Sequence, residues 1–327
     1  MEQRRLGNSE LLLSEIGFGA WAIGGGDYAF GWGPQDDADS ISAIHHALNK
    51  GVNWIDTAPV YGLGRSEKVV GNALRGIRGE VIIATKCGLV WDEQRQIGSR
   101  LTAASVREEA ENSLRRLQTD HIDLYQMHWP DPEEEIEEAW ATMADLVQEG
   151  KVRYIGVSNF STGQMELLGA MHPIASLQPP YSMLRRDIET NQLPYCGEKG
   201  IGMIAYSPLQ NGLLTGKFSL ESIAALDDTD FRKRNNRNFQ SPQVEINLAF
   251  VEALRPIADS VEMTLPQLAL AWVLRRPEVT SAITGIRTPG QIEETVKASG
   301  RPLEKGVMDD IGALLDGRDT ELASAVG

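Results

Sequence analysis

The sequence predicts an α/β fold, a (β/α)8 or TIM barrel formed by a single domain over residues 1–327. Two observations lead to this prediction. Short runs rich in β-branched residues alternate with longer segments of helical periodicity, and this alternation repeats eight times along the chain. The chain is also longer than an average domain, yet it lies within the length range of one such barrel.

The eight expected strands are short, and most of them are bounded by polar or turn-forming residues. They are predicted at residues 15–20, 53–58, 81–86, 123–128, 152–158, 176–179, 202–206 and 281–285. Repeated β-then-α units imply parallel strands joined by right-handed crossovers. Eight units favour a closed barrel over an open doubly wound sheet, because the G-x-G-x-x-G turn expected after the first strand of such a sheet is missing.

Two additions to the barrel are also expected. Residues 4–6 and 12–13, joined by a turn at residues 7–9, predict an N-terminal β-hairpin. A long loop of about 60 residues is predicted after the seventh strand. Within this loop, the basic run at residues 232–237 is either a solvated segment or a cover for a bound cofactor.

Capping signals mark several of the predicted helices. A helix over residues 133–149 spaces its apolar residues by three and four and stops at Gly150. Pro289 suits the first position of the helix after the eighth strand. Capping boxes are expected at Ser105 with Glu108, at Ser161 with Gln164 and at Thr288 with Gln291.

Composition and charge restrict the kinds of partner. The net charge of −15, from 46 acidic and 31 basic residues, argues against nucleic acid and anionic membranes as partners. We see no signal peptide and no apolar run long enough to cross a membrane. Only two cysteines occur, which predicts a cytoplasmic protein without a disulfide framework, and Cys87 is interpreted as a packing residue. The five histidines lack metal-ligand spacing, so no metal is expected.

Four ionisable side chains are predicted to meet at the barrel mouth. Asp56, Lys86 and His128 end the second, third and fourth strands, and Tyr61 lies in the loop after Asp56. Active sites of such barrels form at the C-terminal ends of the strands. Taken singly, each residue is more often structural than functional. Together they are harder to explain as packing, because burying charged groups costs desolvation energy.

This set of side chains suits proton transfer to a carbonyl oxygen. A free tyrosine has a pKa near 10 and is a reluctant acid or base at neutral pH. We expect the Lys86 ammonium to favour the phenolate form of Tyr61, with Asp56 holding the ammonium in place. His128 is expected to donate a hydrogen bond to the substrate oxygen.

Several runs of this chain, in order along almost its whole length, resemble the aldo-keto reductases. These runs are IDTAPVYGLGRSEKVVG (55–71), ATKCG (84–88), SLRRLQTDHIDLYQMHWPDP (113–132), GKVRYIGVSNF (150–160), QPPYS (178–182), AYSPLQNGLLTGK (205–217) and ITGIRTPGQIEE (283–294). The HWPDP and IRTPGQ forms resemble bacterial NADPH-dependent members of the general stress protein type. The resemblance implies reduction of aldehydes and ketones to alcohols by hydride transfer from NADPH.

The resemblance also implies the residues of the site. The catalytic tetrad would be Asp56, Tyr61, Lys86 and His128, with Tyr61 as the general acid/base. The cofactor would be held by Ala20, Trp21, Asp56, Ser158, Asn159, Gln178, Tyr206, Ser207, Leu209, Gly212, Lys217, Gly285, Arg287, Gln291, Glu294 and Thr295. The substrate pocket would be formed by Trp21, Tyr61, Trp91, His128 and Trp129.

The residues expected around the adenosine end of the cofactor bear on the preference for NADPH or NADH. Arg287 would suit the extra phosphate of NADP, next to a helix N-terminus that favours anions. Mammalian members of the family carry a basic residue where Gln291 stands and asparagine where Thr295 stands, so this chain departs from them. The expected partner is a small-molecule carbonyl compound, and the protein is expected to be a monomer or a small homo-oligomer.

Two other functions remain open from the sequence. Potassium-channel β-subunits resemble this family, so the chain could be a cofactor-binding regulatory protein. A lysine at a barrel strand end also serves Schiff-base lyases. A carboxylate near Lys86 argues against the lyase, because it would keep the amine protonated.

Overall fold

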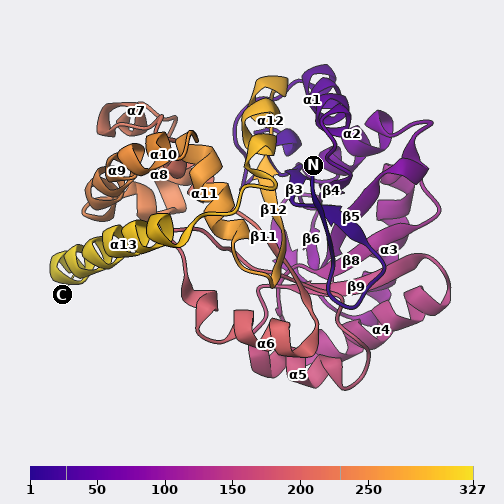
Figure 1. Cartoon of the computed structure of the whole chain (residues 1–327). Helices are drawn as coiled ribbons and strands as arrows, with labels where there is room; N and C mark the ends of the chain where they lie inside the picture. Colours follow the sequence, from indigo (N-terminus) through magenta and orange to yellow (C-terminus); the bar gives the residue numbers. More distant parts are fainter. Residues whose placement is uncertain (27, 229, 327) are drawn as a thin grey trace.

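The computed structural model, described here for residues 1–26, 28–228 and 230–326, contains a closed barrel of eight parallel strands (Figure 1). The strands are β3 (Ile16–Gly19), β4 (Trp54–Asp56), β5 (Ile82–Cys87), β8 (Ile122–Met127), β9 (Val152–Ser158), β10 (Ser176–Gln178), β11 (Gly202–Ala205) and β12 (Val279–Gly285). Each strand pairs with the next one along the chain, and β12 pairs with β3 to close the ring. The predicted barrel and its eight strands are confirmed.

A two-stranded hairpin packs against the N-terminal ends of the barrel strands. It consists of β1 (Gln3–Arg5) and β2 (Leu12–Ser14), which pair antiparallel as predicted. Leucines from this hairpin join Trp54 in a separate apolar cluster. The indole N–H of Trp54 lies near two acceptors, the carbonyl oxygen of Ser14 at 3.2 Å and Oγ of Ser281 at 3.1 Å. This end of the barrel is therefore filled and hydrogen-bonded, which leaves the opposite end for the site.

A layer of helices surrounds the barrel, and the main core lies between helices and strands. The helices that follow successive strands are α1 (Asp37–Asn49), α2 (Arg65–Ala73), α3 (Ala103–Leu117), α4 (Ile136–Gln148), α5 (Thr162–Gly169), α6 (Gln192–Lys199), α11 (Leu265–Leu274) and α12 (Pro289–Thr295). The capping boxes at Ser161 and Thr288 are confirmed. The one at Ser105 is wrong: Thr102 caps α3, and the Ser105 hydroxyl donates to Glu109 instead.

Two insertions extend the barrel mouth. The predicted long segment after β11 contains short helices, namely η5 (Gln210–Thr215), α7 (Leu220–Ala224), α8 (Phe231–Asn235), η6 (Arg237–Phe239), α9 (Gln243–Ala253) and α10 (Arg255–Ser260). Figure 1 shows α7 to α10 grouped beside the barrel, with the C-terminal helix α13 (Lys305–Val326) packed along α9. After β5, the sequence reading missed a hairpin of β6 (Leu89–Trp91) and β7 (Ile97–Ser99).

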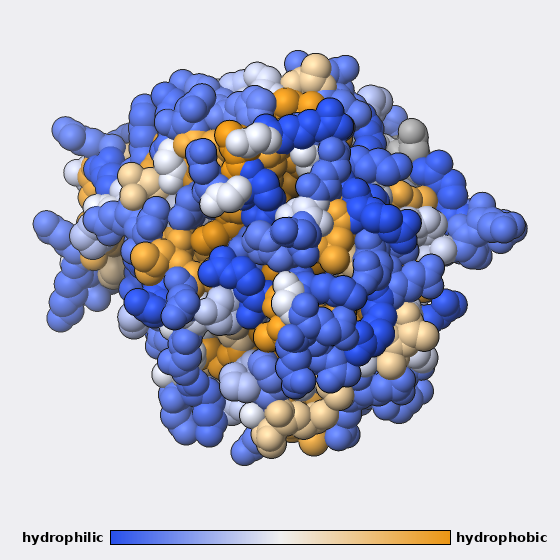
Figure 2. All heavy atoms as spheres, turned by 90° about the vertical axis from the view of Figure 1, so that its right-hand side faces the viewer, coloured by the Kyte–Doolittle hydropathy of each residue, from blue (hydrophilic) through white to orange (hydrophobic). Residues whose placement is uncertain are grey.

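The outer surface is polar on the face that is turned to the viewer in Figure 2. The face seen in Figure 2 is largely hydrophilic, and its apolar side chains lie in separate patches. Within the described part of the chain, we find no helix whose length and apolarity would let it cross a membrane.

The close packing of Gly17 on Trp54 gives a test of the fold. A Cβ at Gly17 would lie 2.2 Å from Cζ2 of Trp54, a buried and rigid ring. We expect Gly17→Ala to lower the free energy of unfolding by about 3 kcal/mol, measured by denaturant unfolding. Gly79→Ala, where a Cβ meets nothing within 4 Å, is the matched control. Equal stability of the two variants would contradict the packing described.

Candidate active site

A buried ion pair lies at the C-terminal ends of β4 and β5. The Nζ atom of Lys86 donates to Oδ1 of Asp56 at 2.7 Å and to the carbonyl oxygen of Thr57 at 3.0 Å. Its third partner is the Tyr61 hydroxyl at 3.4 Å. The Lys86 side chain is fully buried. Three acceptors for three N–H groups fit an ammonium ion.

Tyr61 is held over this ion pair by a tight turn between β4 and α2. Gly62, Leu63 and Gly64 all have positive φ. A Cβ at Gly62 would lie 2.1 Å from the carbonyl oxygen of Gly24, so the turn packs directly on the loop after β3. Only glycine fits Gly62, because both the backbone conformation and the close approach exclude a side chain. The turn therefore fixes the phenol beside Lys86.

The pKa of Tyr61 shifts against our expectation. Burial of the phenol raises its pKa well above 10, and the nearby carboxylate of Asp56 raises it further. The net shift is upward because desolvation of the phenolate dominates, and the expected stabilisation of the phenolate by the Lys86 ammonium does not determine its direction. Tyr61 is therefore a protonated donor at neutral pH. Burial likewise lowers the pKa of Lys86, and the charge of Asp56 opposes that shift.

His128 faces Tyr61 across the cavity floor, with the two ring centroids 5.9 Å apart. Burial lowers the pKa of His128 well below 6.5, and the charge of Lys86 adds to this effect. The imidazole is therefore neutral at neutral pH. A neutral imidazole carries one N–H, which suits a hydrogen bond to a substrate oxygen.

Polar side chains from three further strand ends form one linked cluster. The Gln178 amide donates to Oδ2 of Asp56 at 2.8 Å, which leaves its carbonyl oxygen available to a ligand. The Ser158 hydroxyl donates to the backbone carbonyl of Gln178 at 2.8 Å and accepts from the Asn159 amide at 3.0 Å. The Tyr206 hydroxyl donates to Asn159 at 2.9 Å. These groups offer the donors, acceptors and flat ring that a nicotinamide carboxamide and its ring need.

The chain after β11 is wound in an unusual backbone conformation. Ser207, Gln210, Asn211 and Gly212 all have positive φ. Successive residues with helical and left-handed dihedrals turn backbone N–H groups toward one concave surface, which suits a phosphate. Ser207, Leu209 and Gly212 line the same cavity.

The far end of the cavity carries Arg287 at the start of α12. Its guanidinium donates to Oε1 of Gln35 at 2.7 Å and to the backbone carbonyls of Pro34 at 2.5 Å and Trp32 at 3.4 Å. These three oxygens are neutral, so they leave its positive charge uncompensated. The carboxamide oxygen of Gln291 accepts the backbone N–H of Arg287 at 2.7 Å. The Gln291 side chain therefore occupies part of the N-terminus of α12.

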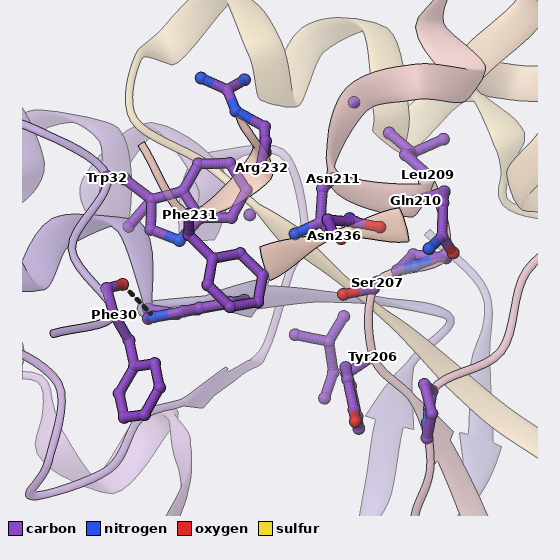
Figure 3. Close-up of a pocket in the computed structure, with 18 of the residues that line it drawn as sticks. Phe30, Trp32, Tyr206, Ser207, Leu209, Gln210, Asn211, Phe231, Arg232 and Asn236 are labelled. Atoms are coloured by element: carbon purple, nitrogen blue, oxygen red, sulfur yellow. Dashed lines mark hydrogen bonds between the residues drawn. The ribbon is translucent and has the colours of Figure 1, made fainter. Parts of the chain in front are cut away.

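Aromatic side chains from two loops enclose the mouth (Figure 3). The Trp21 ring stacks on Tyr61 at 6.3 Å and meets the edge of Phe231 at 5.6 Å. Trp32 packs on Trp21 at 5.2 Å, and the Arg232 guanidinium lies 5.1 Å from the Trp32 ring. Residues from the 232–237 run thus line the cavity, which favours the covering role over a purely solvated loop.

The cavity has a volume of about 1410 Å³, enough for a dinucleotide with a small substrate. Most of the predicted site residues line it, including Trp21, Asp56, Tyr61, His128, Trp129, Ser158, Asn159, Gln178, Tyr206, Ser207, Leu209, Gly212, Lys217, Gly285, Arg287, Gln291, Glu294 and Thr295. Its wall also includes residues that the sequence did not predict, among them Phe30, Trp32, Leu89, Ile97, Phe218 and Phe231.

Three of the predicted site residues do not line the cavity. Ala20 is fully buried and accepts the Ser66 hydroxyl through its carbonyl. Lys86 lies beneath the cavity and acts on it through Asp56 and Tyr61. Trp91 does not line the cavity, although Ile97, which pairs with it in the β6–β7 hairpin, does. In the part of the chain that the structure covers, no cluster of three metal-ligating side chains occurs.

The comparisons with known proteins show the family of this chain. The aldo/keto reductase family model matches residues 15–316, so the chain belongs to that family. It is 40% identical to the aldo-keto reductase YhdN of Bacillus subtilis (strain 168), covering 97% of this chain and 94% of that protein. It is 36% identical to the NADH-specific methylglyoxal reductase of Escherichia coli (strain K12), covering 91% and 93%.

A solved structure, the glycerol dehydrogenase AKR11B4 from Gluconobacter oxydans, is similar with a TM-score of 0.88. Its sequence identity is 36%, over 97% of this chain and 96% of that one. Aldo-keto reductases are oxidoreductases that use nicotinamide cofactors and act on small-molecule carbonyl substrates.

The close packing of the turn beneath Tyr61 can be tested by measuring the unfolding free energy of glycine variants. Gly62→Ala adds a Cβ where φ is +64° and the neighbouring backbone is in contact, so we expect a loss of about 3 kcal/mol in unfolding free energy. Gly76→Ala has the same kind of backbone, with φ +81° and open space around it, and should lose only about 1 kcal/mol. If both variants unfold at the same denaturant concentration, the contact with Gly24 is not formed.

Proposed function

We propose that this protein reduces aldehydes and ketones to alcohols with NADPH, using Tyr61, Lys86, Asp56 and His128. One observation carries the proposal: the protonated Tyr61 hydroxyl is hydrogen-bonded to a buried Lys86–Asp56 ion pair and faces a neutral His128 in one cavity. We further propose a cytoplasmic protein, monomeric or a small homo-oligomer. The two buried free cysteines are compatible with a reducing compartment.

The residues of this chain would move one proton. NADPH supplies hydride to the carbonyl carbon when it is bound. Tyr61 donates its hydroxyl proton to the carbonyl oxygen, so an alcohol and a phenolate are formed. Lys86 stabilises that phenolate because its ammonium already hydrogen-bonds to the phenol oxygen. His128 donates a hydrogen bond to the substrate oxygen and orients it.

The cofactor would lie along the cavity wall from Tyr206 to α12. Gln178, Ser158 and Asn159 would hold the carboxamide, and Tyr206 would stack on the nicotinamide ring. The wound segment after β11 would take the pyrophosphate, with Lys217 near it. Gly285, Gln291, Glu294 and Thr295 would surround the adenosine end.

NADPH is proposed over NADH because of Arg287. A guanidinium has five N–H donors, and three hydrogen bonds to neutral oxygens leave two donors and the full charge for a phosphate. One relative is named as NADH-specific, so the preference needs a direct test.

The two alternatives predict different behaviour. A Schiff-base lyase needs an unprotonated, accessible amine, whereas Lys86 is fully buried and uses three hydrogen bonds as an ammonium. Borohydride trapping of substrate on Lys86 would support the lyase. A cofactor-binding regulatory protein would bind NADPH tightly without turnover.

Replacing the proposed acid tests the mechanism. We expect Tyr61→Phe to lower kcat for aldehyde reduction by at least about a hundredfold, because the donated proton is lost. The affinity for NADPH, measured by fluorescence titration, should stay within about twofold of the wild type. Activity that survives this substitution would show that another group donates the proton.

Replacing Arg287 tests the cofactor preference. Arg287→Ala should raise the KM for NADPH about tenfold, the effect of losing charge-assisted hydrogen bonds to the phosphate. The KM for NADH should change far less, since NADH lacks that phosphate. Equal changes for the two cofactors would remove the proposed phosphate role.

A further inference from the structure

Tyr61 and Lys86 come from different elements, so their contact depends on how those elements are held together. Tyr61 lies in the turn between β4 and α2, whereas Lys86 lies on β5. The Lys86 Nζ atom and the Tyr61 hydroxyl oxygen are 3.4 Å apart, which is near the upper limit for a hydrogen bond. Little further separation of the turn from the strand would break this bond.

A buried carboxylate on the outer side of β5 joins the turn to the strand. Lys86 points into the barrel, so its neighbour Thr85 faces the surrounding helices. The Thr85 hydroxyl donates to Oε1 of Glu67 at 2.6 Å. Glu67 lies in the first turn of α2, the helix that directly follows the Tyr61 turn, and its side chain is fully buried. One hydrogen bond therefore ties the residue next to Lys86 to the helix that extends the Tyr61 turn.

Arg116, near the C-terminal end of α3, compensates the charge of Glu67. Its Nε donates to Oε2 of Glu67 at 2.5 Å, and its Nη2 donates to the Ser113 hydroxyl at 3.4 Å. The stem of Arg116 also packs on the turn, because a Cβ at Gly64 would lie 2.9 Å from its Cδ atom. Both carboxylate oxygens of Glu67 are thus occupied, and the guanidinium that neutralises it rests against the end of the turn that carries Tyr61.

The charge of Glu67 also acts on Lys86. Burial lowers the pKa of Lys86, and the carboxylates of Asp56 and Glu67 oppose that shift. Glu67 therefore favours the ammonium form from the outer face of β5, whereas Asp56 does so from the inner face. Apolar side chains of similar volume often stabilise a core as well as a buried ion pair does. Stability alone therefore does not account for the pair of Glu67 and Arg116.

We propose that Glu67 is a positioning residue, which fixes the strand of Lys86 and the turn of Tyr61 relative to each other and so maintains their hydrogen bond. The consequence for carbonyl reduction rests on the proposed function. The tie between turn and strand does not, because it follows from the contacts of Glu67 with Thr85 and Arg116.

Thr85 offers the mildest way to break this tie. Glu67→Ala would leave the largely buried Arg116 guanidinium without its carboxylate and would threaten folding. Thr85→Val keeps the shape of the side chain but removes the hydroxyl, whereas Thr85→Ser keeps the hydroxyl and is the conservative rescue variant. Thr142→Val is the matched control, because it removes a buried hydroxyl that donates to the carbonyl oxygen of Glu138 at 2.8 Å on α4, outside the cavity wall.

Hydrogen–deuterium exchange of the full-length protein, at one fixed pH, tests the tie without any turnover. Amides of the turn are hydrogen-bonded, as where the N–H of Ser66 donates to the carbonyl oxygen of Tyr61 at 3.1 Å. In Thr85→Val we expect protection of peptides covering residues 60–67 to fall about tenfold, the effect of losing a hydrogen bond to a charged group. Thr85→Ser and Thr142→Val should exchange as the wild type does in these peptides.

Steady-state kinetics separate positioning from simple stability. Thr85→Val should lower kcat for aldehyde reduction about tenfold, because a small misplacement of Tyr61 and Lys86 is costly in the transition state. The KM for the aldehyde and the Kd for NADPH should stay within about twofold of the wild type. Thr85→Ser should restore kcat, and Thr142→Val should leave it unchanged.

Wild-type protection of residues 60–67 in Thr85→Val would overturn the proposal, and so would a kcat for Thr85→Val equal to that of Thr142→Val. A wild type that reduces no carbonyl compound would instead refute the proposed function. In that case, a loss of protection confined to Thr85→Val would still support Glu67 as the tie between turn and strand.

Discussion

The buried ion pair between Lys86 and Asp56 is the interaction on which the site depends. Two charges removed from water cost several kcal/mol each unless their geometry and hydrogen bonds compensate. Here the ammonium has three acceptors, and the second oxygen of Asp56 accepts from Gln178. One ion pair thus connects the proton donor Tyr61 to the cluster proposed to hold the nicotinamide. The barrel makes this possible because β4, β5 and β10 end on the same side.

The surrounding chain protects this pair from water and keeps it in place. The turn at Gly62 fixes Tyr61 over Lys86 by packing on Gly24. On the outer side of β5, Glu67 and Glu109 hold Thr85 and the N–H of Gly88. The strand segment that carries Lys86 is therefore restrained from both faces.

The sequence alone predicted the barrel, its hairpin and the four converging side chains, because these follow from periodicity and from the position of each residue at a strand end. The β6–β7 hairpin was not predictable, since its strands have three residues each and lack a clear alternating pattern. Phe30, Trp32 and Phe231 come from irregular segments far apart in sequence, and only tertiary packing brings them together. The raised pKa of Tyr61 could not be predicted, because the Lys86 ammonium can be seen in the sequence whereas the extent of burial cannot.

The central claim is that this cavity binds NADPH and delivers a proton from Tyr61 to a carbonyl oxygen. It is tested most directly by titrating the purified protein with NADPH and NADH by fluorescence, then following the absorbance of the reduced cofactor with a panel of aldehydes. We expect tight NADPH binding and aldehyde-dependent oxidation of the cofactor. Tight binding without turnover would contradict the proposed reaction and favour a regulatory role, and failure to bind either cofactor would contradict both.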